Sequence, residues 1–191
     1  MKIITLTGAS ACGKDTILKR LLKEHNHLKP VVTLTTRPPR EGEIDGVDYN
    51  FTTEEEFKNE FKNLIEYREY NTVNGKWFYG MHKNSINIDS DDIYICILDV
   101  SGVKRLSEYI NKSDNNAEII SVFLECNGRE RLLRSLKREI DINDYQVAEL
   151  CRRYIADLNE VLAHKDMFEM ILNNENDEDT DKCISLISEL I

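Results

Sequence analysis

Glycine and proline are scarce in this chain, with 8 Gly and 3 Pro among its 191 residues. Collagen-like repeats and low-complexity disorder need far more of both, so neither class fits. Hydrophobic residues make up 41% of the chain and charged residues 31%. Since one domain takes roughly 100 to 200 residues, the composition predicts a single compact domain with a hydrophobic core.

Paired cysteines and long apolar runs are also missing. The five cysteines are far apart and form no C-x-x-C pair, which argues against a disulfide framework and against a zinc site. No apolar run approaches the roughly 18 residues that a membrane span needs, and Met1–Thr7 lacks the apolar core of a signal peptide. We therefore expect a cytoplasmic protein that has no membrane segment.

Positive charge is in deficit, because 25 Lys and Arg stand against 35 Asp and Glu, for a formal net charge of -10. A general DNA- or RNA-binding surface needs the opposite sign, since its affinity comes from neutralising phosphates. We expect no nucleic-acid partner. Any phosphate that the protein binds must be held by a local group of residues.

Short runs rich in Ile and Val alternate along the chain with segments of helical periodicity. Strands are expected at Ile3–Thr7, Val31–Thr35, Ile93–Leu98, Ile119–Leu124 and Phe168–Leu172. Helices are expected at Asp15–Glu24, Val103–Ile110, Arg129–Lys137, Gln146–Leu162 and Lys182–Ile191, with a solvated acidic loop at Asn173–Asp181. This alternation predicts an α/β fold with a parallel sheet flanked by helices.

The stretch Thr52–Lys83 breaks that alternation. It contains one short helical segment, Glu54–Lys62, and two aromatic-rich extended pieces, Leu64–Tyr70 and Lys76–Tyr79. We interpret it as part of a small inserted lobe.

A phosphate-binding loop is predicted between the first strand and the first helix, where Gly8–Lys14 matches the pattern G-x-x-x-x-G-K. Its glycines let backbone N–H groups surround phosphate oxygens, the helix N-terminus adds positive potential, and Lys14 can reach the outer phosphates. Lys14 is accordingly a catalytic candidate. The predicted ATP-binding residues here are Gly8, Ala9, Ser10, Ala11, Cys12, Gly13, Lys14, Asp15 and Thr16.

The residue after Lys14 departs from the usual pattern, in which a Ser or Thr hydroxyl contacts Mg²⁺. Asp15 stands there and Thr16 follows. Either Thr16 supplies the hydroxyl, or Asp15 binds the metal directly, or Asp15 only favours the positive helix N-terminus. Asp99, at the end of a buried strand, is a further metal candidate because such strand ends face the ligand crevice of an open sheet.

Two arginines flank a Pro-Pro pair and suit a phosphate: Arg37 and Arg40, with Tyr49 as a hydroxyl donor nearby. Together with the phosphate loop, the whole stretch Thr33–Phe51 resembles guanylate kinase, a family of P-loop nucleoside monophosphate kinases. The resemblance runs along nearly the whole chain. It implies a P-loop NTPase-type sheet with an inserted acceptor-binding lobe and a helical lid, and transfer of the γ-phosphoryl group of Mg-ATP to GMP or dGMP.

The resemblance also implies a division of the single domain 1–191 and roles for particular residues. The core would be 1–33, 84–126 and 165–191, the acceptor-binding lobe about 34–83, and the lid about 134–155. The implied GMP-binding residues are Thr33, Arg37, Arg40, Tyr49, Glu66, Tyr79 and Asp99. The implied lid arginines are Arg134, Arg138 and Arg153, and Asn173 would lie near the donor adenine.

Two departures bear on the acceptor. Met81 stands where the family places a hydroxyl that bonds guanine O6, which leaves His82 as an alternative donor, and the segment after Asp99 is shorter than in the family, without its second Asp. Glu66 still suits guanine, because a carboxylate accepts from N1–H and from the exocyclic amine, which adenine does not offer together. The alternatives are a related kinase that phosphorylates another nucleotide or a ribose bisphosphate, and a non-catalytic module that binds phosphopeptides.

Overall fold

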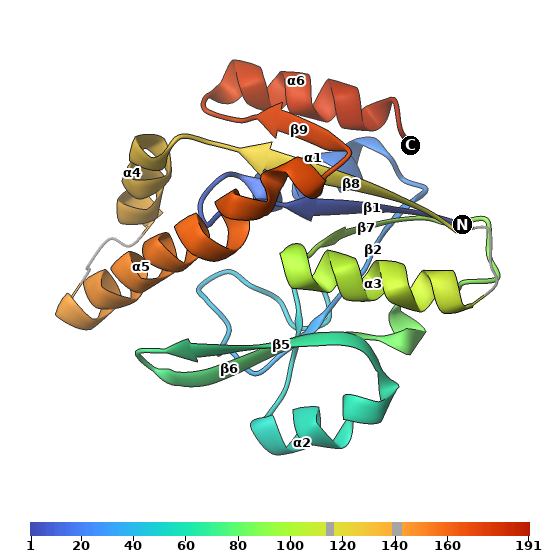
Figure 1. Ribbon diagram of the computed structural model, residues 1–191, viewed down its shortest axis with the longest axis horizontal. Coiled ribbons are helices and arrows are strands. Elements are labelled where there is room, and N and C mark those ends of the chain that lie inside the picture. Colours follow the sequence, from blue (N-terminus) through green and yellow to red (C-terminus); the bar gives the residue numbers. More distant parts are fainter. Residues whose placement is uncertain (114–116, 139–142) are drawn as a thin grey trace.

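The computed structural model describes residues 1–113, 117–138 and 143–191 (Figure 1). Within them, five strands form the main sheet in the order β2-β7-β1-β8-β9, and every neighbouring pair is parallel. The strands are β1 (Lys2–Thr7), β2 (Leu28–Pro30), β7 (Ile93–Ile97), β8 (Glu118–Glu125) and β9 (Met170–Asn173). The predicted α/β fold with a parallel sheet is confirmed.

Helices cover both faces of this sheet (Figure 1). The helices α1 (Lys14–Glu24) and α6 (Asp177–Ser188) pack on one face, and α3 (Val100–Lys112) packs on the other. Successive side chains of β1 alternate between the two faces: Ile4 and Leu6 join the core under α1 and α6, and Ile3 joins the core under α3. Full burial of each such side chain contributes about 1.5–3 kcal/mol.

A second sheet with the order β4-β3-β6-β5 lies beside the α3 face (Figure 1). Its strands are β3 (Leu34–Thr35), β4 (Asn50–Phe51), β5 (Leu64–Thr72) and β6 (Gly75–His82). The short helix α2 (Glu54–Asn59) begins with a capping box between Thr53 and Glu56, and the 3-10 turns Phe61–Asn63 and Lys83–Ser85 flank the hairpin. A separate small core of Phe57, Leu64 and Phe78 holds this lobe together.

The predicted strand Val31–Thr35 is wrong for residues 31–33, and only Leu34–Thr35 is a strand. The chain leaves the main sheet after β2 at Pro30 and enters the second sheet with β3 at Leu34. Val31 still donates its backbone N–H to Ile95 of the main sheet, whereas Thr33 already accepts from Asn50 of the second sheet. One apolar run therefore serves two sheets, because its backbone hydrogen bonds change partner within three residues.

The predicted acidic loop before the last helix is also wrong. Helix α6 begins at Asp177, because the Asn176 side chain accepts from the backbone N–H of Asp179. Asp177, Glu178 and Asp179 lie in the first turn, where the helix dipole favours negative charge.

Two helices, α4 (Gly128–Arg138) and α5 (Asp144–Ala156), extend from the carboxyl end of the main sheet in the region where a lid is expected, and α5 passes above the β5–β6 hairpin in Figure 1. The predicted helix Gln146–Leu162 is interrupted, since a π turn (Asp157–Val161) and a 3-10 segment (Leu162–Met167) follow α5. Residues 139–142 of the expected lid lie outside the described residues. None of the described helices has the length and apolar character that a membrane crossing requires.

Candidate active site

The loop Gly8–Gly13 joins β1 to α1 in a conformation that demands glycine at its end. Gly13 has a φ of 97°, and a Cβ at this position would lie 2.3 Å from Nδ2 of Asn174. That same amide donates to the backbone carbonyl of Cys12 over 2.7 Å. The loop is therefore shaped both by its own glycine and by Asn174, a buried residue just after β9.

Lys14 curls back over this loop, and its ammonium group donates to the carbonyl oxygens of Gly8 at 2.7 Å and Ala9 at 3.0 Å. No side chain caps the N-terminus of α1, so its first backbone N–H groups are available to an anion. A helix N-terminus and an adjacent ammonium group together make a site for phosphate oxygens.

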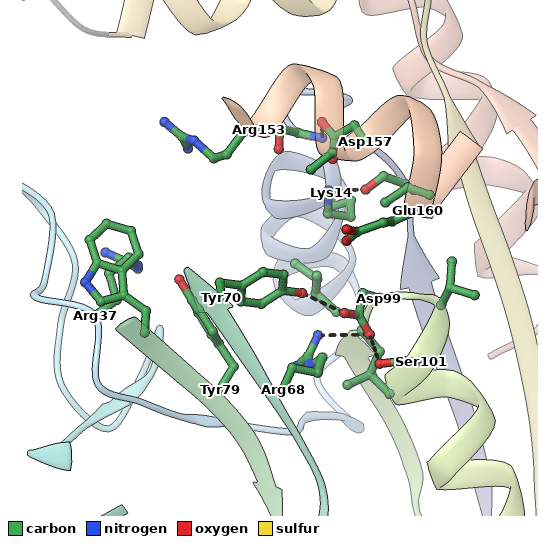
Figure 2. A pocket seen from close by; sticks show the side chains of 18 of the residues that line it. Lys14, Arg37, Arg68, Tyr70, Tyr79, Asp99, Ser101, Arg153, Asp157 and Glu160 are labelled. Carbon is green, nitrogen blue, oxygen red and sulfur yellow. Dashed lines mark hydrogen bonds and ion pairs between the residues drawn. The ribbon is translucent and has the colours of Figure 1, made fainter. Parts of the chain in front are cut away.

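A cavity of about 570 Å³ opens above this loop and extends to the second sheet (Figure 2). Its volume lies within the range of roughly 300–1,000 Å³ that small-molecule sites occupy. The predicted site residues that line it are Gly8, Ser10, Ala11, Lys14, Asp15, Thr33, Arg37, Arg40, Tyr49, Tyr79, Asp99, Arg138 and Arg153. Residues from the loop, from the segments around the second sheet, and from α4 and α5 thus face one space.

On the lobe side of the cavity, Arg37 forms an ion pair with Glu43 at 2.9 Å and has a side chain that is only 3% exposed. Its guanidinium lies over the rings of Tyr49 and Phe51, 5.3 and 5.8 Å from their centroids. Burial, together with the charge of Asp15, raises the pKa of Tyr49 to about 12. Tyr49 is therefore a neutral hydroxyl donor beside a positioned guanidinium, a pairing that suits a phosphate dianion.

Between these two ends lies Asp99, which caps α3. Its carboxylate accepts hydrogen bonds from the backbone N–H of Gly102 at 2.7 Å and from the Tyr70 hydroxyl at 2.6 Å (Figure 2). Burial alone would raise the pKa of Asp99, but the charge of Arg68 and these hydrogen bonds hold it below its ordinary value. Asp99 is therefore ionised at neutral pH.

Comparison with known proteins accords with this arrangement. The family model described as "Guanylate kinase" matches residues 1–190. The chain belongs to the guanylate kinase family.

Relatives of the same description span nearly the whole chain. The guanylate kinase of Wolbachia sp. subsp. Brugia malayi (strain TRS) is 33% identical over 99% of this chain and 91% of its own length. That of Mesomycoplasma hyopneumoniae (strain 7448) is 29% identical over 100% of this chain and 93% of its own length. The crystal structure of guanylate kinase from Anaplasma phagocytophilum superposes with a TM-score of 0.69 at 22% identity, covering 98% of this chain and 82% of that one. This last similarity supports the shared fold.

Several of the predicted site residues do not line the cavity, some of them from the phosphate-loop pattern and some implied by the resemblance to guanylate kinase. Thr16 is exposed, and Cys12 and Glu66 are buried outside the cavity lining. Arg134 donates to the carbonyl oxygens of Asn174 and Glu175 beyond β9. Three further predicted residues do not line the cavity: Ala9, Gly13 and Asn173. The Asn173 side chain instead donates to Asp179 over 3.4 Å.

The alternative that His82 replaces the missing hydroxyl finds no support. Its ring nitrogens contact a Glu60 carboxylate oxygen at 3.2 Å and the backbone N–H of Asn84 at 3.0 Å, and the residue does not line the cavity. Met81 is fully buried. The two residues after Gly80 therefore supply no donor to this space.

Sequence reasoning missed several residues that line the cavity, notably Arg68, Tyr70, Lys104, Arg152 and Asp157. A signal for two of them was present in the sequence. Side chains two residues apart on a strand share a face, so the expected strand Leu64–Tyr70 already placed Arg68 and Tyr70 on the same side as Glu66. Asp157 carried no such signal, because its position depends on the π turn after α5.

Proposed function

We propose that this protein phosphorylates GMP, and dGMP, with Mg-ATP as the donor, giving ADP and the nucleoside diphosphate. As a guanylate kinase family member it is an ATP-dependent nucleoside monophosphate kinase. The observation that carries the proposal is the single cavity that joins the phosphate loop at Lys14 to the Arg37–Tyr49 pair. Two phosphate-binding groups that face one space are what direct transfer between two nucleotides requires.

The donor phosphates would bind at the uncapped N-terminus of α1 and at Lys14, with the acceptor phosphate on Arg37, Arg40 and Tyr49. Because the acceptor is itself a phosphate anion, no general base is needed. The protein's task is to align the two phosphates and to neutralise charge that develops during transfer. Lys14, Arg138 and Arg153 are the cations assigned to that second role, supported by their positions around the cavity.

Mg²⁺ would enter with the ATP phosphates. Of the two metal candidates, Asp15 lines the cavity and Thr16 does not, and a carboxylate oxygen is a ligand that a hard cation accepts. When bound, Mg²⁺ neutralises phosphate charge and orients the donor oxygens. Among the described residues, no group of three or more His, Cys, Asp or Glu side chains gathers to hold a metal, which agrees with a metal held mainly by the nucleotide.

We infer that the chain consists of a core of 1–33, 84–126 and 165–191, an acceptor lobe of about 34–83 and a lid of about 134–155. The separate small core of Phe57, Leu64 and Phe78 supports an independent lobe. The lid and the lobe meet where the backbone N–H of Val73 donates to Glu149 of α5 over 3.2 Å. A lid that closes over the lobe at this contact would keep water away from the cavity during transfer. The five free cysteines support a reducing compartment such as the cytoplasm.

An acceptor panel tests the proposed function. Purified protein is mixed with Mg-ATP and, separately, GMP, dGMP, AMP, CMP, UMP and a ribose bisphosphate, and ADP release is followed in each. We expect rapid turnover with GMP and dGMP and little with the others. Turnover with another acceptor would indicate a related kinase, and nucleotide binding without turnover would indicate a binding module.

A further inference from the structure

Arg68 occupies an unusual position at the floor of the acceptor cavity. Glu66, Arg68 and Tyr70 alternate along β5 and share one face, and Arg68 pairs in register with Tyr79 of β6, with its guanidinium 6.0 Å from that ring's centroid. The Glu66 side chain is fully buried, whereas that of Arg68 is 11% exposed and lines the cavity. Arg68 therefore presents the surface that a ligand meets, with Glu66 beside it.

The guanidinium is anchored to two carboxylates but retains hydrogen-bonding capacity. It donates through Nη2 to Glu66 Oε1 over 3.3 Å. Its Nη1 lies 3.6 Å from Asp99 Oδ1, beyond hydrogen-bond distance (Figure 2). Its Nε lies 3.1 Å from Glu66 Oε2 without hydrogen-bond alignment. A guanidinium has five N–H donors, so most of them are not used by these contacts.

An arginine and a glutamate side by side present a donor next to an acceptor. The edge of guanine offers the complementary order, with O6 as acceptor followed by N1–H and the exocyclic amine as donors. Adenine offers the reverse at the first two positions, an amine donor and an N1 acceptor. Arginine is also the side chain that most often recognises guanine, through O6 and N7.

We propose that Arg68 is a specificity-determining residue that donates to guanine O6 of the acceptor nucleotide. The Glu66 carboxylate lies buried beside it, outside the cavity lining, so it would accept from N1–H and the amine only once nucleotide binding draws the Arg68 guanidinium aside. This inference rests on the proposed function. It also accounts for the burial of Met81 and the outward contacts of His82, because O6 then has its donor on the opposite strand of the hairpin. The same guanidinium would reject AMP, since it would face an amine donor.

Three acceptors distinguish base reading from simple support of Glu66: GMP, IMP and AMP. IMP keeps O6, N7 and N1–H but lacks the exocyclic amine. If Arg68 donates to O6, its loss lowers kcat/KM for GMP and for IMP by the same factor and leaves kcat/KM for AMP unchanged or raised. If Arg68 only positions Glu66, its loss removes the reading of the amine, so the preference of GMP over IMP falls.

The test uses Arg68→Lys, because lysine keeps the charge that compensates Glu66 and Asp99 but lacks the planar fork of donors. We expect kcat/KM for GMP and for IMP to fall together by roughly 5- to 150-fold, with the GMP-to-IMP ratio unchanged and the GMP-to-AMP ratio lowered. Arg68→Met is the second variant, used if its melting temperature stays within a few degrees of wild type. Arg105→Lys is the matched control, since Arg105 contacts the Tyr67 carbonyl of the same strand outside the cavity.

The outcomes separate the two proposals. A wild-type enzyme that does not use GMP would overturn the proposed function and this inference together. A wild-type enzyme that uses GMP, combined with Arg68→Lys kinetics equal to those of Arg105→Lys, would overturn the inference alone. A fall in the GMP-to-IMP ratio would also overturn it, because Arg68 would then act through Glu66.

Discussion

Asp157 accepts a hydrogen bond from the backbone N–H of Ser10 over 2.8 Å, although 147 residues separate them in the chain. The same carboxylate oxygen lies 3.1 Å from Nη1 of Arg131, whose side chain is only 2% exposed and whose guanidinium lies 4.9 Å from the ring centroid of Tyr154. Helix α4 and the turn after α5 are thereby tied to the phosphate loop through one carboxylate.

Asp157→Ala is predicted to destabilise the protein, because it leaves Arg131 buried without its partner. Loss of one member of a buried ion pair costs about 3–5 kcal/mol. Asp157→Asn keeps an acceptor for Ser10 and should cost less. Urea unfolding measures both, with Asp181→Ala, which breaks an exposed pair with Arg20, as the control expected to change little. Equal losses in Asp157→Ala and Asp181→Ala would contradict the structural role.

Lys14→Met is predicted to lower kcat by at least about 10²-fold, the effect of removing one donor that stabilises transition-state charge. The fold should persist. In the described part of the chain, the oxygen atoms to which the Lys14 ammonium group donates are all backbone carbonyls of its own loop. Lys23→Met, an exposed change on the same helix, is the control. The idea fails if steady-state rates of the two variants agree.

Glu43→Gln is predicted to raise KM for GMP several-fold with a smaller effect on kcat. The Glu43 carboxylate pairs with Arg37 and also accepts from the backbone N–H of Arg40, so it holds both sides of the predicted phosphate site. Burial raises and the Arg37 hydrogen bond lowers the pKa of Glu43, and the net shift is downward. Initial rates over a GMP series measure the effect, with exposed Glu41→Gln as the control. An unchanged KM would rule out this positioning role.

Asp99→Asn is predicted to flatten the acid limb of the stability curve. Because the folded-state pKa of Asp99 is lowered, its contribution is complete above the unfolded value of about 3.9 and is lost as pH falls through the folded pKa. The difference in unfolding free energy between wild type and Asp99→Asn should therefore be largest near neutral pH and shrink below about pH 4. Urea unfolding at a series of pH values checks this, and a constant difference would be inconsistent with it.

The sequence predicted the parts of the fold that depend on neighbouring residues. The strand before Gly8, the loop through Gly13 and the helix after Lys14 all follow from apolar runs, glycine spacing and helical periodicity. The breaks in regular structure were not predicted. Val31–Thr35 has one continuous β-type pattern, and only the separate hydrogen-bond partners Ile95 and Asn50 divide it between two sheets.

The candidate site divides in the same way. The chain alone identified the phosphate loop and the Arg37–Arg40 cluster as groups suited to phosphate, because each is a chemical pattern within a few consecutive residues, whereas Glu66 was implied only by the resemblance to guanylate kinase. Tertiary structure decided that Arg68 lines the cavity while Glu66 beside it is buried, that Asn174 shapes the loop at Gly13, and that Asp157 contacts Ser10. Those contacts join residues from different elements, and their energies depend on burial and on distances of a few ångströms, which exist only once the sheets and the lid have packed.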